Sequence, residues 1–389
     1  MEPFMADPSS LLPRLQQLGT ISIEQFLNEY WQKKPLLIRQ AFPDFQAPVS
    51  ADELAGLALE DDVVSRLVVQ RDETDWQVEH GPLPEERFAQ LPESHWTLLV
   101  QHADALDPAI NALLDAFRFI PNWRLDDIMI SYAADKGGVG PHFDYYDVFL
   151  LQAQGKRRWR IGQRCSHESP LLPAADMKIL QDFDTVEDWI VEPGDLLYIP
   201  PNIAHWGEAD GECMTYSIGF RAPSHAEVLL DFSEEMASFT NPDMRYTDPG
   251  LRQQALAGEI SQQSIEQVQA IIHQYSTDKG ALAGWFGEYM TRPNPTADAH
   301  FQAFDEEFDR SLLEAGQARL SSFARCAFFK EQADCLLFIN GAKWRCSRKL
   351  AVMLSNREPI QWDSLDTLDQ TVVAQIADAG FLISSEDDE

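Results

Sequence analysis

Two histidines and one aspartate are spaced so that they could hold a metal ion. His142 and Asp144 lie two positions apart, just before the apolar run 148–151. Side chains at i and i+2 of a β-strand project from the same face, so a strand here would aim both groups at one point. His205 follows a second apolar segment, residues 196–199. Two imidazoles and one carboxylate on separate strands can form the facial triad that holds Fe(II) and leaves positions open for other ligands.

The other histidines are not predicted to bind a metal. A lone histidine beside a strand is more often a core or surface residue than a ligand, and none of the others has a partner at ligand spacing. We therefore expect ordinary structural roles for His80, His95, His102, His167, His225, His273 and His300.

A basic run follows the first two candidate ligands. An incomplete metal shell leaves room for a bidentate co-substrate and dioxygen, and a dicarboxylate would also need a cation deeper in the fold. Strand alternation places Lys156, Arg158 and Arg160 on one face and Arg157 on the other. A single inward arginine is more easily satisfied than three cations, and its fork suits a carboxylate. We therefore expect Arg157 inside and the others at the surface.

The elements around these residues are short strands separated by Gly and Pro. Many short strands with regular breakers favour a sandwich, jelly roll or barrel. Two metal-binding strands that converge on one interior favour a double-stranded β-helix, the jelly roll of the cupin kind. The predicted strands are 128–132, 143–152, 156–161, 189–191, 196–199 and 214–220, with breakers that include Gly155 and Gly211.

An N-terminal extension precedes these strands, and its predicted elements alternate between helices and strands. Ser22 and Ser50 are suitable N-caps for the first two helices. The helices are predicted at 23–31, 52–59 and 108–119, and the strands at 36–38, 63–69, 75–79 and 96–100.

The pattern changes twice after residue 222, so we predict three parts in a chain that is mainly β with α. Residues 1–222 form the catalytic domain with its extension, and 223–310 a helical domain with helices at 226–239, 264–275 and 279–290. Residues 311–389 form a winged-helix-like module, because an Asn340-Gly341 hairpin precedes helices at 348–355 and 367–379. The apolar stripe of 264–275 favours dimerisation, although packing on the barrel would give the same periodicity.

The chain is strongly acidic, with 30 basic and 63 acidic residues and a net charge of −33. It should repel phosphate backbones and attract a basic partner, so direct nucleic-acid binding is not expected. Simple solubility, or a saline habitat, would explain the same acidity. The apolar runs are shorter than the ~20 residues of a membrane span. Five cysteines without a Cys-x-x-Cys pair, and no secretory signal, suggest a reduced cytoplasmic protein.

Several motifs resemble one known family. They are Phe26-Leu27-x-x-Tyr30-Trp31-x-Lys33-Lys34-Pro35-Leu36, Gly140-Pro141-His142-Phe143-Asp144, Gly155-Lys156-Arg157-Arg158-Trp159, and Glu192-Pro193-Gly194-Asp195 through Pro200-Pro201-x-x-x-His205. Together they resemble the JmjC-type ribosomal oxygenases, and more closely the bacterial family that hydroxylates an arginine of large-subunit ribosomal protein sixteen. The resemblance runs from about residue 20 to the C-terminus.

The resemblance implies an Fe(II)-dependent hydroxylase that uses 2-oxoglutarate and dioxygen, dimerises through its helical region and acts on a basic ribosomal protein. His142, Asp144 and His205 match the family's metal triad. Arg157 matches the residue that binds the distal carboxylate of 2-oxoglutarate, where eukaryotic relatives have lysine, and Ser217 would be a second contact.

Three points stay open in the sequence. Acidic residues at the mouth of the site should hold a substrate guanidinium, and Asp135 and Asp147 are candidates. The same chemistry could act on a histidine of a ribosomal protein or on another macromolecule. A cupin-like metal-binding protein without turnover is the rival from another class, but it would have no need of a buried Arg157.

Overall fold

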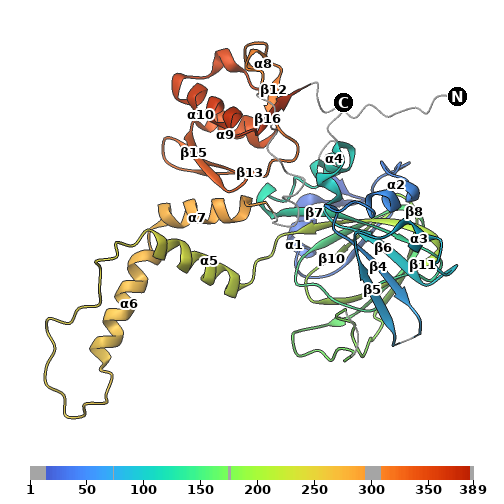
Figure 1. The fold of residues 1–389 in the computed structure, drawn as a ribbon, viewed down its shortest axis with the longest axis horizontal. Coiled ribbons are helices and arrows are strands. Elements are labelled where there is room, and N and C mark those ends of the chain that lie inside the picture. The colour runs from blue at the N-terminus through green and yellow to red at the C-terminus, as the bar shows by residue number, and fades with distance from the viewer. Residues whose placement is uncertain (1–14, 73, 174–176, 294–307, 386–389) are drawn as a thin grey trace.

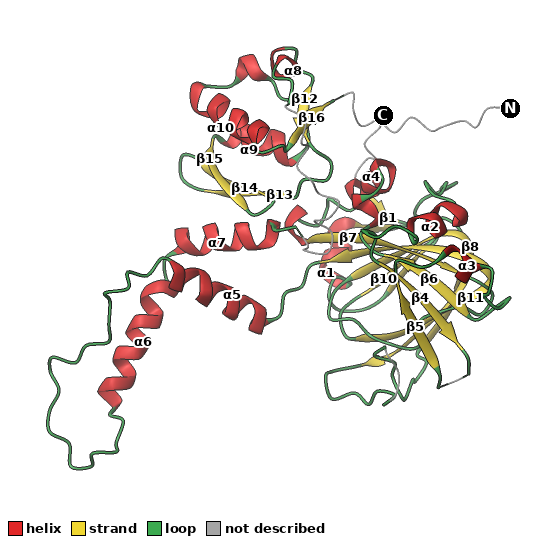
Figure 2. Ribbon diagram, in the orientation of Figure 1, coloured by secondary structure: helices red, strands yellow, loops and turns green. Residues whose placement is uncertain are grey.

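The computed structural model describes residues 15–72, 74–173, 177–293 and 308–385. Among these residues, nine antiparallel strands form one sheet in the order β3-β10-β8-β11-β7-β6-β4-β5, with β9 paired to β8 (Figures 1 and 2). The strands are β3 (Leu36–Ile38), β4 (Ser65–Gln70), β5 (Trp76–His80), β6 (Trp96–Val100), β7 (Leu125–Ala133), β8 (Val148–Arg164), β9 (Glu187–Val191), β10 (Leu196–Ile199) and β11 (Ile203–Phe220). The predicted jelly-roll class is confirmed.

Two long strands, β8 and β11, lie next to each other in the sheet and share its longest ladder. Gly155 has φ +61°, and a Cβ there would lie 2.0 Å from the carbonyl oxygen of Glu212. β8 therefore bends at Gly155 without ending, and the register with β11 shifts opposite it, between Asp210 and Met214. The predicted break between strands 143–152 and 156–161 is thus wrong, because a left-handed glycine lets the ladder continue.

The segment that carries the first two candidate ligands is not a strand. β8 begins at Val148, and His142 forms an isolated bridge with His205. The carbonyl of Asp144 accepts a hydrogen bond of 2.7 Å from the amide of Asn202, in a turn rather than in a neighbouring strand. The prediction of a strand over 143–147 is therefore wrong. His205 follows β10, as predicted, and lies near the start of β11, which begins at Ile203.

The N-terminal extension packs on the sheet through short capped helices. The serines at 22 and 50 accept hydrogen bonds from the first turns of α1 (Ile23–Glu29) and α2 (Ala51–Leu57), as predicted. Phe26 of α1 is fully buried, with its ring 4.9 Å from that of Tyr198 in β10. The remaining elements before β8 are β1 (Gln17–Leu18), β2 (Ile21–Ser22), α3 (Glu85–Phe88), η1 (Ala103–Ala105), α4 (Pro108–Ala116) and η2 (Asn122–Arg124).

Three helices, α5 (His225–Ser238), α6 (Gln262–Ser276) and α7 (Lys279–Thr291), extend away from the sheet as an arm (Figure 1). The predicted stripe of α6 does not pack on the barrel. Its side chains stay between 44% and 64% exposed: Ile265, Val268, Ile271 and Ile272. The alternative of barrel packing is therefore wrong for this helix, while α7 packs on the C-terminal strands through Gly287 and Phe338.

The C-terminal part has its own buried core. Its elements are α8 (Ser311–Glu314), β12 (Ala318–Leu320), β13 (Cys326–Lys330), β14 (Cys335–Ile339), β15 (Ala342–Cys346), α9 (Arg348–Ser355), η3 (Trp362–Ser364), α10 (Thr367–Asp378) and β16 (Leu382–Ser384). Asn340 and Gly341 have φ of 46° and 81°, the left-handed pair that a type I′ turn requires, so the predicted hairpin is confirmed. The winged-helix comparison and the three-part division stay predictions. None of the described helices is long and apolar enough to cross a bilayer.

Candidate active site

His142, Asp144 and His205 come together although only His205 belongs to a regular strand. One ligand atom from each lies within 4.8 Å of the others. The Nε2 atoms of His142 and His205 are 3.9 and 3.6 Å from Oδ2 of Asp144. Two backbone hydrogen bonds between the histidines, of 3.0 and 2.8 Å, fix their separation. The convergence expected from strand geometry is thus achieved by a two-histidine bridge and a turn.

Each histidine is oriented by a main-chain carbonyl. The Nδ1 atoms of His142 and His205 lie 2.9 and 3.0 Å from the carbonyl oxygens of Gly140 and Ile203. A carbonyl only accepts, so Nδ1 must carry the proton and Nε2 presents its lone pair to the centre. Burial, and then the neighbouring His142, lower the pKa of His205 to about 4. Two imidazoles that present Nε2 to the centre, together with a single carboxylate, fit the ligand set of a facial triad.

The three groups line a cavity of about 500 Å³ inside the sheet. Arg157, which is 3% exposed, lines the same cavity. The ring of Trp159 lies near both groups, with its centroid 5.2 Å from the Arg157 guanidinium and 5.9 Å from the His205 ring. The predicted alternation is confirmed, because Lys156, Arg158 and Arg160 point outward to Glu192, Asp188 and Glu208.

The buried guanidinium of Arg157 is incompletely paired. Its Nη1 donates to the hydroxyls of Ser131 and Thr215 at 3.1 and 3.3 Å, and its Nε has no hydrogen-bond partner. Burial lowers the pKa of Arg157, and no ion pair offsets this charge among the described residues. A buried arginine without a carboxylate is costly, so the arrangement suits the distal end of a dicarboxylate ligand.

Ser217 also lines the cavity, but the hydroxyl on β11 that contacts Arg157 is that of Thr215, two residues earlier. The sequence analysis missed Thr215 and Ser131. The period of two could have identified Thr215, because it shares the strand face of Ser217. The contact of Ser217 with a co-substrate stays a prediction.

The two acidic residues proposed to hold a guanidinium are wrongly chosen, because neither lines the cavity. The carboxylate of Asp147 is fully buried and accepts from the Tyr198 hydroxyl at 2.6 Å and from Gln32 at 2.9 Å. Asp135 accepts from the amide of Gly211 at the bend of β11. Both carboxylates serve the fold, and neither role was visible from their positions in the sequence.

A different acidic group lies in the cavity wall. Asp127 is buried at the start of β7, and its Oδ2 is 3.1 Å from Nδ1 of His102. Burial opposes the charge of His102, but Asp127, Asp104 and Asp126 outweigh it and raise the pKa of His102. The expectation that His102 is ordinary missed this pair, because its partner lies 25 residues away.

Comparison with known proteins places this geometry in a family. Residues 112–228 match the family described as the JmjC domain. The chain is 38% identical to ribosomal protein uL16 3-hydroxylase of Escherichia coli over 279 residues, 72% of this chain and 74% of the relative. It is 32% identical to the probable ribosomal oxygenase of Haemophilus influenzae over 363 residues, 90% and 89% of the two chains.

Solved structures agree with the sequence matches. The X-ray structure of E. coli YcfD superposes with a TM-score of 0.81 at 30% identity, covering 95% of this chain and 99% of that one. A second structure, of the E. coli ribosomal oxygenase YcfD with cobalt and 2-oxoglutarate, gives a TM-score of 0.80 at 30% identity, with 94% and 99% covered. With its sheet, its triad and these matches, the chain belongs to the JmjC-domain ribosomal oxygenases.

Proposed function

We propose that the protein is an Fe(II)- and 2-oxoglutarate-dependent hydroxylase of an arginine side chain in a large-subunit ribosomal protein. The observation that carries this proposal is one cavity that is lined by the His142, Asp144 and His205 cluster and also by the buried Arg157, which has no ion-pair partner among the described residues. A metal site with only a structural role would not need such a cation. The YcfD structure with cobalt and 2-oxoglutarate supports the same ligands for this chain.

Different residues of the cavity have different roles in the proposed reaction. When bound, Fe(II) with 2-oxoglutarate and dioxygen supplies the oxidation that converts a C–H bond into C–OH. His142, Asp144 and His205 would hold the iron through Nε2, a carboxylate oxygen and Nε2. Arg157 would receive the distal carboxylate of 2-oxoglutarate, with Ser217 a candidate second contact. The ring of Trp159 is buried beside Arg157 and His205 and lines the same cavity.

An arginine substrate fits the acidic wall of the cavity. The acidic residues that line it are Asp126, Asp127 and Asp144. Asp144 belongs to the triad and Asp126 is engaged by two arginines. Asp127 is held by His102 through Oδ2, so its Oδ1 is the carboxylate oxygen that we assign to a substrate guanidinium. The name of the E. coli relative gives uL16 as its substrate, and a basic ribosomal protein would be attracted by a net charge of −33.

The assembly that we propose is a homodimer formed through the arm. Four exposed apolar side chains on one face of α6, with Leu229 and Leu230 of α5 more than 60% exposed, form a surface that a second copy would cover. We also propose that the three parts of the chain divide at residues 222/223 and 310/311. The protein is expected in the cytoplasm, together with its ribosomal-protein substrate. It is not expected to bind nucleic acid directly.

Mass spectrometry of the purified ribosomal protein, after incubation with this enzyme, Fe(II) and 2-oxoglutarate, tests the proposal. We expect the mass of one added oxygen on an arginine, with stoichiometric succinate. Asp144→Ala should lower turnover by at least about a thousandfold, because it removes a ligand, while the fold is kept. Asp188→Ala removes an exposed carboxylate on β9 and serves as the matched control.

The outcome separates the rivals. Oxygen added to a histidine would move the reaction to the alternative substrate residue. No product together with no succinate would leave the non-catalytic metal-binding protein as the better account. Full activity in Asp144→Ala would exclude this aspartate from the metal site.

A further inference from the structure

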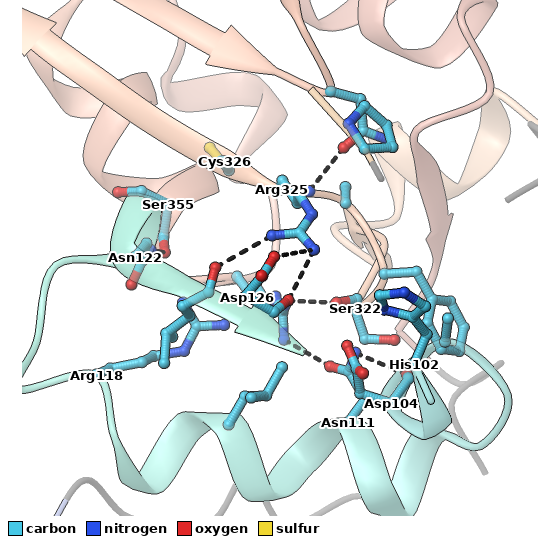
Figure 3. A pocket seen from close by; sticks show the side chains of 18 residues that line it. His102, Asp104, Asn111, Arg118, Asn122, Asp126, Ser322, Arg325, Cys326 and Ser355 are labelled. Carbon is cyan, nitrogen blue, oxygen red and sulfur yellow. Dashed lines mark hydrogen bonds and ion pairs between the residues drawn. The ribbon is translucent and has the colours of Figure 1, made fainter. Parts of the chain in front are cut away.

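The three parts of the chain meet at the start of β7, where Asp126 lies. Arg325, from the C-terminal part, donates to the carbonyl oxygens of Leu125 and Asp126 at 3.1 and 2.7 Å, and lies 3.4 Å from the Asp126 carboxylate (Figure 3). Arg221, just after β11, contacts the same carboxylate at 3.1 Å. Arg221 also donates to the carbonyl oxygens of Met290 and Arg292 at the end of α7, at 2.8 and 2.7 Å.

Arg325 is itself fixed by the hairpin turn. Its amide donates to Oδ1 of Asn340 at 2.7 Å, and the Asn340 amide donates back to the Arg325 carbonyl at 3.1 Å. This hairpin turn is also joined to α7, because the Gly341 amide donates to the Thr291 hydroxyl at 3.1 Å. The guanidinium therefore reaches β7 from a rigid base and not from a free loop.

This junction and the active site share a wall. Asp126 and His102 line both the 500 Å³ cavity and a smaller cavity of about 80 Å³ between the sheet and the C-terminal part (Figure 3). The next residue, Asp127, holds His102, and the amide of Ile128 donates to Asp104 at 2.8 Å. The ladder between β7 and β11 is irregular here, with a register shift between Ile218 and Phe220. The first residues of β7 therefore depend on contacts from outside the sheet.

We propose that the C-terminal part, through Arg325, positions the start of β7 so that Asp127 presents its carboxylate in the active-site cavity. Arg325 is thus a positioning residue for the basic substrate, and the C-terminal part helps to build the substrate side of the site. The inference rests on the proposed function for the role of Asp127. Within the described part of the chain, Arg325 lines the smaller cavity and not the 500 Å³ cavity, and it has no contact with the triad or with Arg157. Its loss should weaken substrate binding and spare co-substrate binding.

Arg325→Ala tests this, with Arg325→Lys as the conservative variant and Arg357→Ala as the matched control. Arg357 crosses the same junction to α4, where it donates to Asn111 at 3.2 Å and lies 3.7 Å from the Asp115 carboxylate, and it also donates to the carbonyl of Ser322. We expect Arg325→Ala to raise the KM for the ribosomal protein by about ten- to a hundredfold, because small displacements in a site are costly. The kcat and the Kd for 2-oxoglutarate of the metal-loaded protein should stay within about twofold. Arg325→Lys should bring the KM for the ribosomal protein part of the way back to the wild-type value. Arg357→Ala should keep this KM within about twofold of the wild type.

Hydrogen exchange supplies a readout that does not depend on turnover. Backbone amides of residues 126–129 should exchange faster in Arg325→Ala than in the wild type or in Arg357→Ala. Unchanged exchange there, or equal KM changes in the two alanine variants, would overturn the positioning role. Should the wild-type enzyme leave the ribosomal protein unmodified, the proposed function fails, and the exchange measurement still decides whether Arg325 holds β7.

Discussion

The environment of Arg157 is the strongest indication of a bound anionic ligand. A fully buried cation with two neutral hydroxyl partners destabilises the ligand-free protein. Replacing Arg157 by Met should therefore stabilise the metal-loaded, ligand-free enzyme by about 1 kcal/mol or more in urea unfolding. The same change should raise the KM for 2-oxoglutarate at least about thirtyfold, since it removes the partner of a buried carboxylate. Arg158→Met, on the outward face, should do neither. If Arg157→Met gains as much stability as the wild type from the same concentration of 2-oxoglutarate, the assignment is wrong.

Asp104 should make the free energy of unfolding depend on pH. Burial, and then the charge of Asp127, raise the pKa of Asp104 to about 6, against the opposing effects of the Ile128 amide, Arg325 and His102. The folded state thus binds a proton that the unfolded state releases near pH 4. The stability from this group is complete below about pH 4 and is lost as the pH rises through about 6.

Asp104→Asn should remove that pH dependence. The difference in unfolding free energy between the variant and the wild type should shift in favour of the variant by up to about 3 kcal/mol between pH 4 and pH 8. Asp61→Asn, an exposed carboxylate, is the control and should track the wild type. A constant difference between Asp104→Asn and the wild type across this range would show that Asp104 titrates normally.

At the scale of elements, features that depend on neighbouring residues could be predicted from the sequence, whereas pairing between distant segments could not. Ser22, Ser50 and the Asn340-Gly341 pair act through neighbours within four residues, so caps and the hairpin turn followed from the sequence. The metal triad was predictable because its residue types and flanking motifs are specific. The bridge between His142 and His205, the continuous β8 across Gly155, and the His102 pair with Asp127 depend on which segments the fold brings together, and spacing alone does not contain that information.

The α6 helix gives a prediction at this scale. A double change of Ile265 and Ile272 to Glu should convert a wild-type dimer into a monomer in analytical ultracentrifugation. In a twofold interface each substitution acts twice, and each buried aliphatic side chain contributes about 1.5–3 kcal/mol, so the dissociation constant should rise by at least about a hundredfold. Gln269→Glu adds charge at an exposed position of the same helix and should leave the dimer intact. A monomeric wild type would remove α6 from any self-association.

At the scale of the whole molecule, the net charge of −33 has two explanations that differ in their dependence on salt. If the acidity attracts a basic substrate, raising the ionic strength from about 0.05 to about 0.3 M should raise the KM for the ribosomal protein several-fold, because exposed charges are screened. The KM for 2-oxoglutarate should change little, since Arg157 is 3% exposed and screened much less. A short peptide with the target arginine between neutral residues should lose most of the salt dependence. Equal salt effects on protein, peptide and 2-oxoglutarate would mean that the charge serves solubility and that substrate selection resides in the cavity alone.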